Sequence, residues 1–328
     1  MPFLRHRMVR MVLPVTAVLL SVLMVITYYY RGAGPLSEPT TIVFKKGMGF
    51  EAIVDSMADN NVIRFPLVFK VLAVAMGDAR QFKAGEYRFT AAISPKLVMD
   101  MIAHGRVVVR KITVPEGYTV KEIIALLDAQ EALSGSVTDY VKEGSLLPQT
   151  YHYSYGDSRE ELIVRMREAM HSTLAELWPT RAENLPLKDM NDAVTLASIV
   201  EKETGIAEER GRVAAVFTNR LRRNMKLQSD PTVIYAVEQK SGPLKRALTR
   251  ADLRADSPYN TYRYFGLPPA PIANPGRKSI EAVLNPPASN EYYFVATGNG
   301  GHHFSETLKQ HNEFVKQYRK VLQQKQAQ

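Results

Sequence analysis

The sequence predicts an α+β fold: a single N-terminal transmembrane helix, a small α+β domain, and a larger mixed α+β domain with a helical frame and turn-rich cleft loops. Three observations lead to this prediction. An uncharged run fills residues 11–30, a strand–turn–helix pattern occurs twice within residues 41–130, and long helical patterns in residues 131–328 give way to segments dense in Pro, Gly and Asn. A chain of 328 residues also suggests about two domains.

The composition excludes several classes of protein. Hydrophobic residues make up 45% and charged residues 23%, so the chain is neither disordered nor of low complexity. There is no cysteine, which excludes disulfide frameworks, cysteine-based metal sites and thiol nucleophiles. The net charge is +9, but four arginines fall in residues 1–31, where there is no acidic residue. The remaining positive charge is mild and spread out.

The basic residues of the C-terminal half do not form a stripe. Arg220, Arg222, Arg223 and Lys226 alternate around a predicted helix, so we expect them on a solvated face. A nucleic-acid binder would concentrate such residues. The sequence therefore predicts no nucleic-acid partner.

Residues 11–30 are predicted to span a membrane, between a cytoplasmic tail at 1–10 and a linker at 31–40. A helix of 20 residues is about 30 Å long, the thickness of a bilayer core. Three arginines precede the run, and the positive-inside rule places them in the cytoplasm. The alternative is a cleaved signal peptide, but its apolar region would be about 7–15 residues long and end at small residues. This run ends in three tyrosines, which favours an uncleaved anchor.

The small domain is predicted from a repeated pattern. Residues 41–44 alternate like a strand, and a glycine turn and a helical face over 50–57 follow. Residues 111–127 repeat this order. Between the two copies, 64–76 is predicted as a helix and 84–89 as a strand, and Pro95 opens a further helix.

The larger domain, residues 131–328, is predicted from a change in the residue pattern along the chain. Residues 159–178 and 188–203 have helical periodicity, while residues 257–301 are rich in proline and glycine. Helical periodicity returns over 306–323. Loops on a helical frame commonly build a cleft.

The segment LASIVEKETG, residues 196–205, carries the candidate catalytic group. Glu201 and Glu203 lie about 200° apart on a helix, so they cannot serve one site together. Glu203 falls between Leu196, Ile199 and Val200. A carboxyl with such apolar neighbours keeps its proton to higher pH, as a general acid requires.

The end of this helix is predicted at Thr204 and Gly205, with the glycine in the left-handed cap position. That ending would leave Glu203 at a cleft edge. The alternative is that Glu-Lys-Glu is only the solvated end of a helix.

Further motifs follow in order along the chain. They are ASIVEKET (197–204), VFTNRL (216–221), LQSDPTVIY (227–235), YNTY (259–262), GLPPAPIANPG (266–276), GHHF (301–304) and HN (311–312). Together they resemble the endolytic murein transglycosylase family (MltG/YceG-like). The resemblance begins near residue 40 and runs to the C-terminus.

The resemblance implies an inner-membrane lyase that cuts peptidoglycan glycan strands within the chain, with its catalytic domain, 131–328, in the periplasm. Glu203 matches the catalytic glutamate of the family. Residues 41–130 resemble the family's LysM-like domain, a module that binds N-acetylglucosamine polymers; a spacer without sugar contact is the alternative. The expected partners are the glycan strands, the inner membrane and peptidoglycan synthases (penicillin-binding proteins).

Six residues in these motifs are candidates for substrate binding. Hydrogen bonds to sugar hydroxyl or acetamido groups are expected of the first three, and a stacking face with a polar handle of the others. They are Asn219, Gln228, Asp230, Tyr259, Asn260 and Tyr262. Each is also explained as a satisfied core or turn residue, and Asp230-Pro231 as a simple turn.

No cofactor and no metal are predicted. His302, His303 and His311 lack the helical spacing or the cysteine partners of a zinc site. One segment departs from the family pattern: in EGSLLPQTY, residues 143–151, Leu147 replaces an aromatic residue and Gln149 an acid.

The resemblance implies a mechanism with one carboxylate, in which Glu203 donates a proton and takes one back, leaving a 1,6-anhydroMurNAc end. Two other functions remain open at this point. One is a non-catalytic tether that binds peptidoglycan, and the other a hydrolytic muramidase with Asp230 as second carboxylate.

Overall fold

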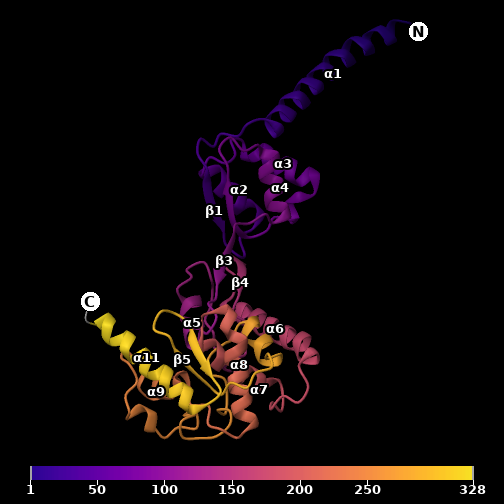
Figure 1. Ribbon diagram of the computed structural model, residues 1–328. Coiled ribbons are helices and arrows are strands. Elements are labelled where there is room, and N and C mark those ends of the chain that lie inside the picture. The colour runs from indigo at the N-terminus through magenta and orange to yellow at the C-terminus, as the bar shows by residue number, and fades with distance from the viewer. Residues whose placement is uncertain (1, 327–328) are drawn as a thin grey trace. The chain divides into compact units, whose positions relative to one another are not determined.

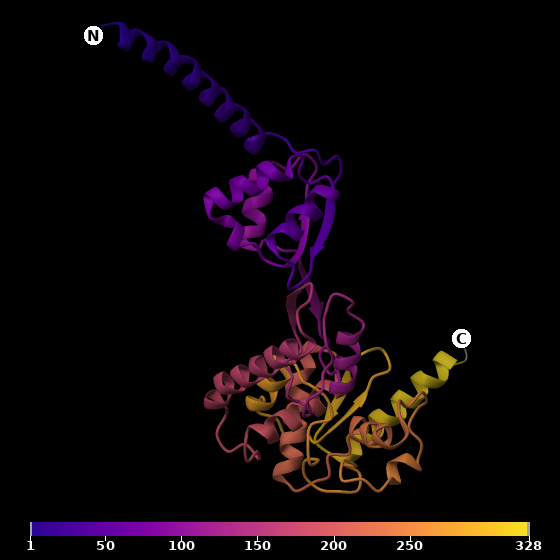
Figure 2. The ribbon, with the colours of Figure 1, turned by 180° about the vertical axis from the view of Figure 1, so that it is seen from behind.

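The computed structural model describes residues 2–326, and the chain divides into two compact units. The first unit runs through Lys111 and includes residues 132–134 and 152–157. The second unit comprises residues 112–131, 135–151 and those from Ser158 on. Figure 1 labels the helices and strands, and Figure 2 shows them from behind. The predicted domain boundary at residue 130 stays a prediction.

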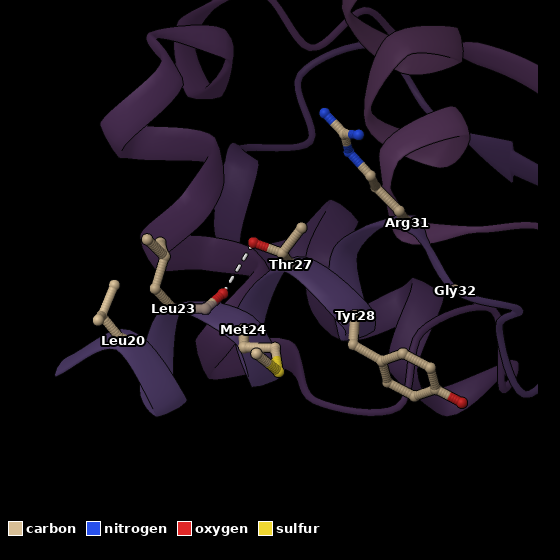
Figure 3. Close-up of a pocket in the computed structure, with 7 residues that line it drawn as sticks. All are labelled: Leu20, Leu23, Met24, Thr27, Tyr28, Arg31 and Gly32. Carbon is tan, nitrogen blue, oxygen red and sulfur yellow. Dashed lines mark hydrogen bonds between the residues drawn. The ribbon is translucent and has the colours of Figure 1, made fainter. Parts of the chain in front are cut away.

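The first unit begins with the apolar helix α1 (Pro2–Arg31), and its residues from Pro14 to Arg31 are long and apolar enough to cross a membrane. Polar groups in this stretch find partners inside the helix. The Thr27 hydroxyl donates to the carbonyl of Leu23 at 2.7 Å, as Figure 3 shows. A bilayer core requires such internal satisfaction of hydrogen bonds.

A two-stranded sheet and three helices form the globular part of the first unit. Strands β1 (Thr40–Phe44) and β2 (Gly85–Phe89) pair antiparallel, and Ile42 lies opposite Tyr87. The helices and a short 3₁₀ turn are α2 (Phe50–Asp59), α3 (Pro66–Met76), η1 (Asp78–Arg80) and α4 (Pro95–His104). These elements confirm the helices and strands predicted for residues 41–104.

The core of this unit follows from the apolar periodicity. Helix α2 buries Ile53, Val54 and Met57, the face that the sequence predicts. These side chains pack in one cluster with Phe44 and Tyr87 of the sheet.

The second copy of the repeated pattern is also present. Strand β3 (Val109–Thr113) pairs with β4 (Thr150–Ser154), and α5 (Val120–Asp128) begins at a capping box made by Thr119 and Glu122. Helix α5 buries Ile123 and Leu127 as predicted. The two copies belong to different units, because residues 112–131 are part of the second unit.

The second unit is mainly helical. Its remaining elements are α6 (Arg159–Leu177), η2 (Trp178–Thr180), α7 (Met190–Glu203), α8 (Ala207–Arg222), α9 (Asp230–Ser241), η3 (Asp252–Arg254), α10 (Arg277–Leu284), β5 (Tyr293–Ala296), β6 (His302–Ser305) and α11 (Leu308–Gln326). Helix α7 contacts α8, α9 and α10, and the β5–β6 hairpin contacts α8 and α11. The predicted mixed α+β architecture is therefore confirmed.

Helix α7 is the central element of this unit. Its residues from Ala193 to Val200 are all buried, so the helix is enclosed on every side. The helix is buried less at its two ends, and Glu203 is the last helical residue at the C-terminal end.

Three local predictions need correction. The turn-rich segment 257–301 contains helix α10, which lies between Pro275 and Pro286. Prolines break a helix when they lie inside it, but here they flank the helix and only bound its length. Gly205 does not take the left-handed cap conformation; Thr204 ends α7 in an extended conformation, and its hydroxyl accepts a hydrogen bond from the backbone N–H of Ile206. Asp230 and Pro231 open helix α9 and do not form a simple turn.

Asn274 holds three segments of the second unit together. Its side-chain NH₂ donates to the Tyr118 carbonyl and to the Glu143 carboxylate, both at 2.9 Å. Its side-chain oxygen accepts the backbone N–H of Leu146 at 3.0 Å, and its backbone carbonyl accepts that of Gly117. Asn274 is fully buried, so water cannot replace these partners.

Replacing Asn274 by alanine is expected to lower the free energy of unfolding by roughly 2–4 kcal/mol, because buried groups of Glu143 and Leu146 lose their partner. Denaturant unfolding of the full chain in detergent measures this change. The control is Asn290→Ala at an exposed position, for which a change below about 0.5 kcal/mol is expected. Equal effects of the two substitutions would show that the hydrogen bonds of Asn274 do not stabilise the second unit.

Candidate functional site

The candidate site is centred on the carboxyl group of Glu203. This side chain is half-buried, and its Oε1 accepts a hydrogen bond of 2.5 Å from the Ser229 hydroxyl. Ser229 is fully buried, and its backbone N–H donates to the Thr261 hydroxyl at 3.0 Å. The Thr232 hydroxyl donates to the Ser229 carbonyl at 2.7 Å. The donor that faces Glu203 is thus held in a fixed position.

The surroundings of Glu203 raise the pKa of its carboxyl to about 7. The largest cause is desolvation, because the protein around the group disfavours the charged form. The negative charge of Asp230 raises the pKa further, while the Ser229 hydrogen bond and the positive charge of Arg220 lower it. Both forms of the carboxyl are therefore accessible near neutral pH, as general acid–base chemistry requires.

Arg220 is buried, which corrects the prediction that it belongs to a solvated face. Its Nε donates to the Tyr292 carbonyl at 2.7 Å, and its Nη1 donates to the carbonyls of Leu227 and Lys226 at 2.7 and 3.3 Å. Burial lowers the pKa of its guanidinium. Arg220 thus fixes the segment that leads into Ser229 and adds a positive charge within electrostatic reach of Glu203.

Asp230 and Tyr262 are brought to the same place. The Tyr262 hydroxyl donates to Asp230 Oδ1 at 2.6 Å. Burial is the largest cause that raises the pKa of Tyr262, and the negative charges of Asp230 and Glu203 raise it further. Gln228 is exposed and has a positive φ of 52°, a conformation that is strained for a residue with a side chain. Its backbone N–H donates to the Thr261 carbonyl at 3.2 Å, which holds the bend.

The other three substrate-binding candidates are placed differently. Asn219 donates to two carbonyls within residues 289–291, at 2.7 and 3.1 Å, and Asn260 donates to two carbonyls within residues 253–255, at 3.1 and 2.8 Å. The amide N–H groups of both are therefore used within the fold. Tyr259 packs its ring against Tyr235, with centroids 5.0 Å apart.

Glu201 has a structural environment that differs from that of Glu203. Its carboxylate accepts the backbone N–H of Gly276 at 2.9 Å, and it lies 3.7 Å from the Arg210 guanidinium. Only 6% of its side chain is exposed. The interpretation of Glu-Lys-Glu as a solvated helix end is therefore wrong, and the two glutamates have separate partners.

Glu143 is a second carboxyl with a raised pKa, and the sequence did not single it out as a site residue. Burial raises its pKa to about 7, although it accepts hydrogen bonds from the backbone N–H of Val120 and from Asn274. It contributes to the walls of three cavities, two of which, of about 410 and 460 Å³, are also lined by Tyr235. The smaller of these two is also lined by Tyr259.

The larger cavity adjoins the chain around Glu203. Its lining includes Lys202 and Pro231, the sequence neighbours of Glu203 and Asp230. The same ends of α7 and α9 therefore carry the acid and line a cavity.

The histidines of the described part of the chain do not form a metal site. Within residues 2–326, no group of three or more His, Asp or Glu side chains has the geometry of a metal site. His302 Nδ1 lies 2.7 Å from Glu209 Oε2, and His303 stacks on the ring of Phe314.

The sequence analysis missed Ser229, Arg220 and Glu143. Ser229 lies between the two candidates Gln228 and Asp230, but only the packing of α9 against α7 shows that its hydroxyl faces a carboxyl. The only signal for Arg220 was its place in the VFTNRL segment, since an arginine near a helix end is usually solvated. Leu147, which departs from the family pattern, is buried in the core and fills space there.

Comparisons with known proteins agree with one another. The sequence is 31% identical over 303 residues to the endolytic murein transglycosylase of Bacillus subtilis (strain 168), covering 83% of this chain and 82% of that protein. It is 28% identical over 327 residues to the endolytic murein transglycosylase of Streptococcus pneumoniae serotype 2 (strain D39 / NCTC 7466), covering 85% of this chain and 58% of that protein. The chain thus spans little more than half of the pneumococcal relative.

A solved structure gives the same result for the fold. The 2.6 Å crystal structure of a YceG-like protein from Listeria monocytogenes matches with a TM-score of 0.54 and 31% identity, covering 84% of this chain and 98% of that chain. The YceG-like family itself matches residues 42–317, which includes Glu203 and every other residue of the candidate site. The chain therefore belongs to the YceG-like family.

Proposed function

We propose that this protein is a membrane-anchored endolytic lytic transglycosylase of peptidoglycan, a lyase that cleaves the MurNAc–GlcNAc bond within glycan strands. The observation that carries the proposal is the Glu203 carboxyl, with its pKa raised to about 7 by burial and a buried hydroxyl donor at 2.5 Å. The endolytic murein transglycosylases of Bacillus subtilis and Streptococcus pneumoniae, to which the chain is similar, support the same activity.

In the first step, protonated Glu203 donates its proton to the glycosidic oxygen. The bond between this oxygen and C1 of MurNAc breaks, and GlcNAc leaves with a free 4-hydroxyl. The electron deficit at C1 has oxocarbenium character. Glu203 becomes a carboxylate, which the Ser229 hydroxyl and the positive charge of Arg220 stabilise.

In the second step, the carboxylate of Glu203 takes the proton from the 6-hydroxyl of the same MurNAc. The oxygen O6 bonds to C1 and closes the 1,6-anhydro ring. The proton that left Glu203 is replaced, so the enzyme returns to its starting state and no water is consumed. One group acts as acid and then as base, and a pKa near the working pH serves both steps.

We propose that Asp230, Tyr262 and Gln228 contact the sugar, because they adjoin Glu203 and Ser229 in the structure. Tyr259 would add a stacking face in the cavity of about 410 Å³. Asn219 and Asn260 would act mainly by holding the loops around the site.

We also propose the arrangement in the envelope. Helix α1 would anchor the protein in the inner membrane, with residues 1–10 in the cytoplasm and the catalytic domain in the periplasm. Residues 41–130 would form a LysM-like domain that binds N-acetylglucosamine polymers. Action on nascent strands beside peptidoglycan synthases would fit an enzyme anchored in the inner membrane.

Replacing Glu203 by glutamine is expected to lower the rate of glycan cleavage by at least about 100-fold, since the general acid is lost. Glu201→Gln is the matched control: glutamine can still accept the Gly276 N–H, so most activity should remain. Mass spectrometry of digests of purified sacculi measures both the rate and the product.

The product identifies the reaction class. Wild-type digests should carry 1,6-anhydro ends, which are one water lighter than reducing ends. Reducing ends would instead support a muramidase with Asp230 as second carboxylate, and the absence of any product would support a tether. Equal loss from the two glutamine variants would overturn the assignment of Glu203.

The pH profile of kcat/KM is expected to fall above about pH 7, as Glu203 loses its proton. In Ser229→Ala this limb should move to higher pH, because the hydrogen bond that favours the charged form is gone. Glu143→Gln is the control, since Glu143 also has a pKa of about 7 and its removal should leave the limb in place. Loss of this limb in Glu143→Gln would show that it reports the ionisation of Glu143, and would contradict its assignment to Glu203.

The raised pKa also predicts a pH-dependent difference in stability. The pKa of Glu203 is about 7 in the folded chain, and its ordinary value is 4.5. The stability that the protonated carboxyl contributes is therefore fully present below about pH 4.5 and is lost as the pH rises through about 7. Glu203→Gln should therefore gain stability over wild type across this window, by up to about 3 kcal/mol. Thermal unfolding of both proteins at pH 4.5 and 8 tests this, and a constant difference would contradict it.

A further inference from the structure

Helix α3 of the first unit exposes an apolar face. Leu67, Val71 and Val74 recur at spacings of four and three, so they share one side of the helix, and all three are exposed. Phe69 and Ala73 on the opposite side are buried in the core. Lys70 is the only charged residue in the helix, and it turns toward Glu51 and Asp55 of α2.

The neighbouring helices of the same unit follow the ordinary rule. Helix α2 buries apolar residues and exposes Glu51 and Asp55, and α4 has Lys96 on its exposed side. A helix that is apolar on both faces is normally enclosed by protein or lipid. The exposed face of α3 therefore calls for a covering partner.

The position of α3 next to α1 indicates what this partner is. The ring of Phe65, directly before α3, packs edge-on against Tyr29 near the end of α1, with centroids 5.4 Å apart. The Tyr29 hydroxyl donates to the Phe65 carbonyl at 3.3 Å. The exposed apolar surface of α3 thus begins where the exposed apolar surface of α1 ends.

The residues at this junction suit a lipid headgroup region. Figure 3 shows Leu20, Met24 and Tyr28 along one side of α1, with Arg31 at its end. Tyrosines are enriched at membrane interfaces, and arginines there can pair with phosphate groups. Arg64, exposed and next to Phe65, adds a second positive charge at this level.

We propose that α3 is an interfacial helix, whose face of Leu67, Val71 and Val74 rests in the headgroup region of the bilayer that α1 spans. The apolar face and the adjoining arginines are the features by which helices lie on a membrane. This inference rests on the proposed membrane anchor and is independent of the enzymatic activity.

The absence of cysteine allows a direct test. Single-cysteine variants Val71→Cys and Val74→Cys of the full chain carry an environment-sensitive fluorophore in vesicles of phosphatidylcholine and phosphatidylglycerol. The matched control is Val109→Cys in β3 of the same unit, because Val109 is 61% exposed and Val71 and Val74 are 68% and 64% exposed. Leu20→Cys in α1, read with nitroxides on the lipid acyl chains because the position lies deep in the span, reports on the anchor itself.

We expect blue-shifted emission at positions 71 and 74 and several-fold stronger quenching by headgroup-level nitroxide lipids than at 109. Quenching at 20 together with solvent-like emission at 71 and 74 would overturn the inference and leave the anchor intact. Blue-shifted emission at 71 and 74 without lipid quenching would also overturn it, in favour of a protein cover such as a second copy. An unquenched probe at 20 would overturn the anchor and the inference together.

Discussion

The chemistry of this protein depends on two opposing effects on the pKa of a single carboxyl group. Glu203 ends a helix whose residues from Ala193 to Val200 are all buried, so its carboxyl meets protein where an ordinary helix end meets water. Desolvation raises its pKa, and the Ser229 hydroxyl and the Arg220 charge limit the rise. Without the first effect Glu203 would be ionised and unable to donate a proton. Without the second its pKa would rise further, and Glu203 would hold its proton too tightly to donate it readily.

The loops around this carboxyl are held by groups that do not touch it. Arg220 binds three backbone carbonyls and thereby fixes the chain that leads to Ser229. Thr261 fixes Ser229 from the other side through its hydroxyl. Asn274 and Glu201 hold neighbouring segments of the same unit. Preorganisation of this kind places a hydrogen-bond donor before charge develops, which is where electrostatic catalysis gains most.

The sequence predicted single helices and strands better than the contacts between them. Periodicity predicted most helices and strands, because each buries an apolar face of its own, as the Ile53–Met57 face of α2 does. It also separated Glu203 from Glu201, since that distinction depends only on helix geometry. It failed for Arg220 and Ser229, whose roles arise from contacts between α8, α9 and α7 that no local pattern encodes. It failed for α10, an eight-residue helix enclosed by prolines.

The ionisation of Glu203 itself is the most direct test of the account. Infrared difference spectra of the wild type against Glu203→Gln, recorded across pH, isolate the carboxyl band of this one residue, because Glu143 and all other acids cancel. A midpoint near pH 7 is the predicted result. A midpoint near the ordinary value of 4.5 would show that the group is solvated, and that it cannot be the acid and base described here.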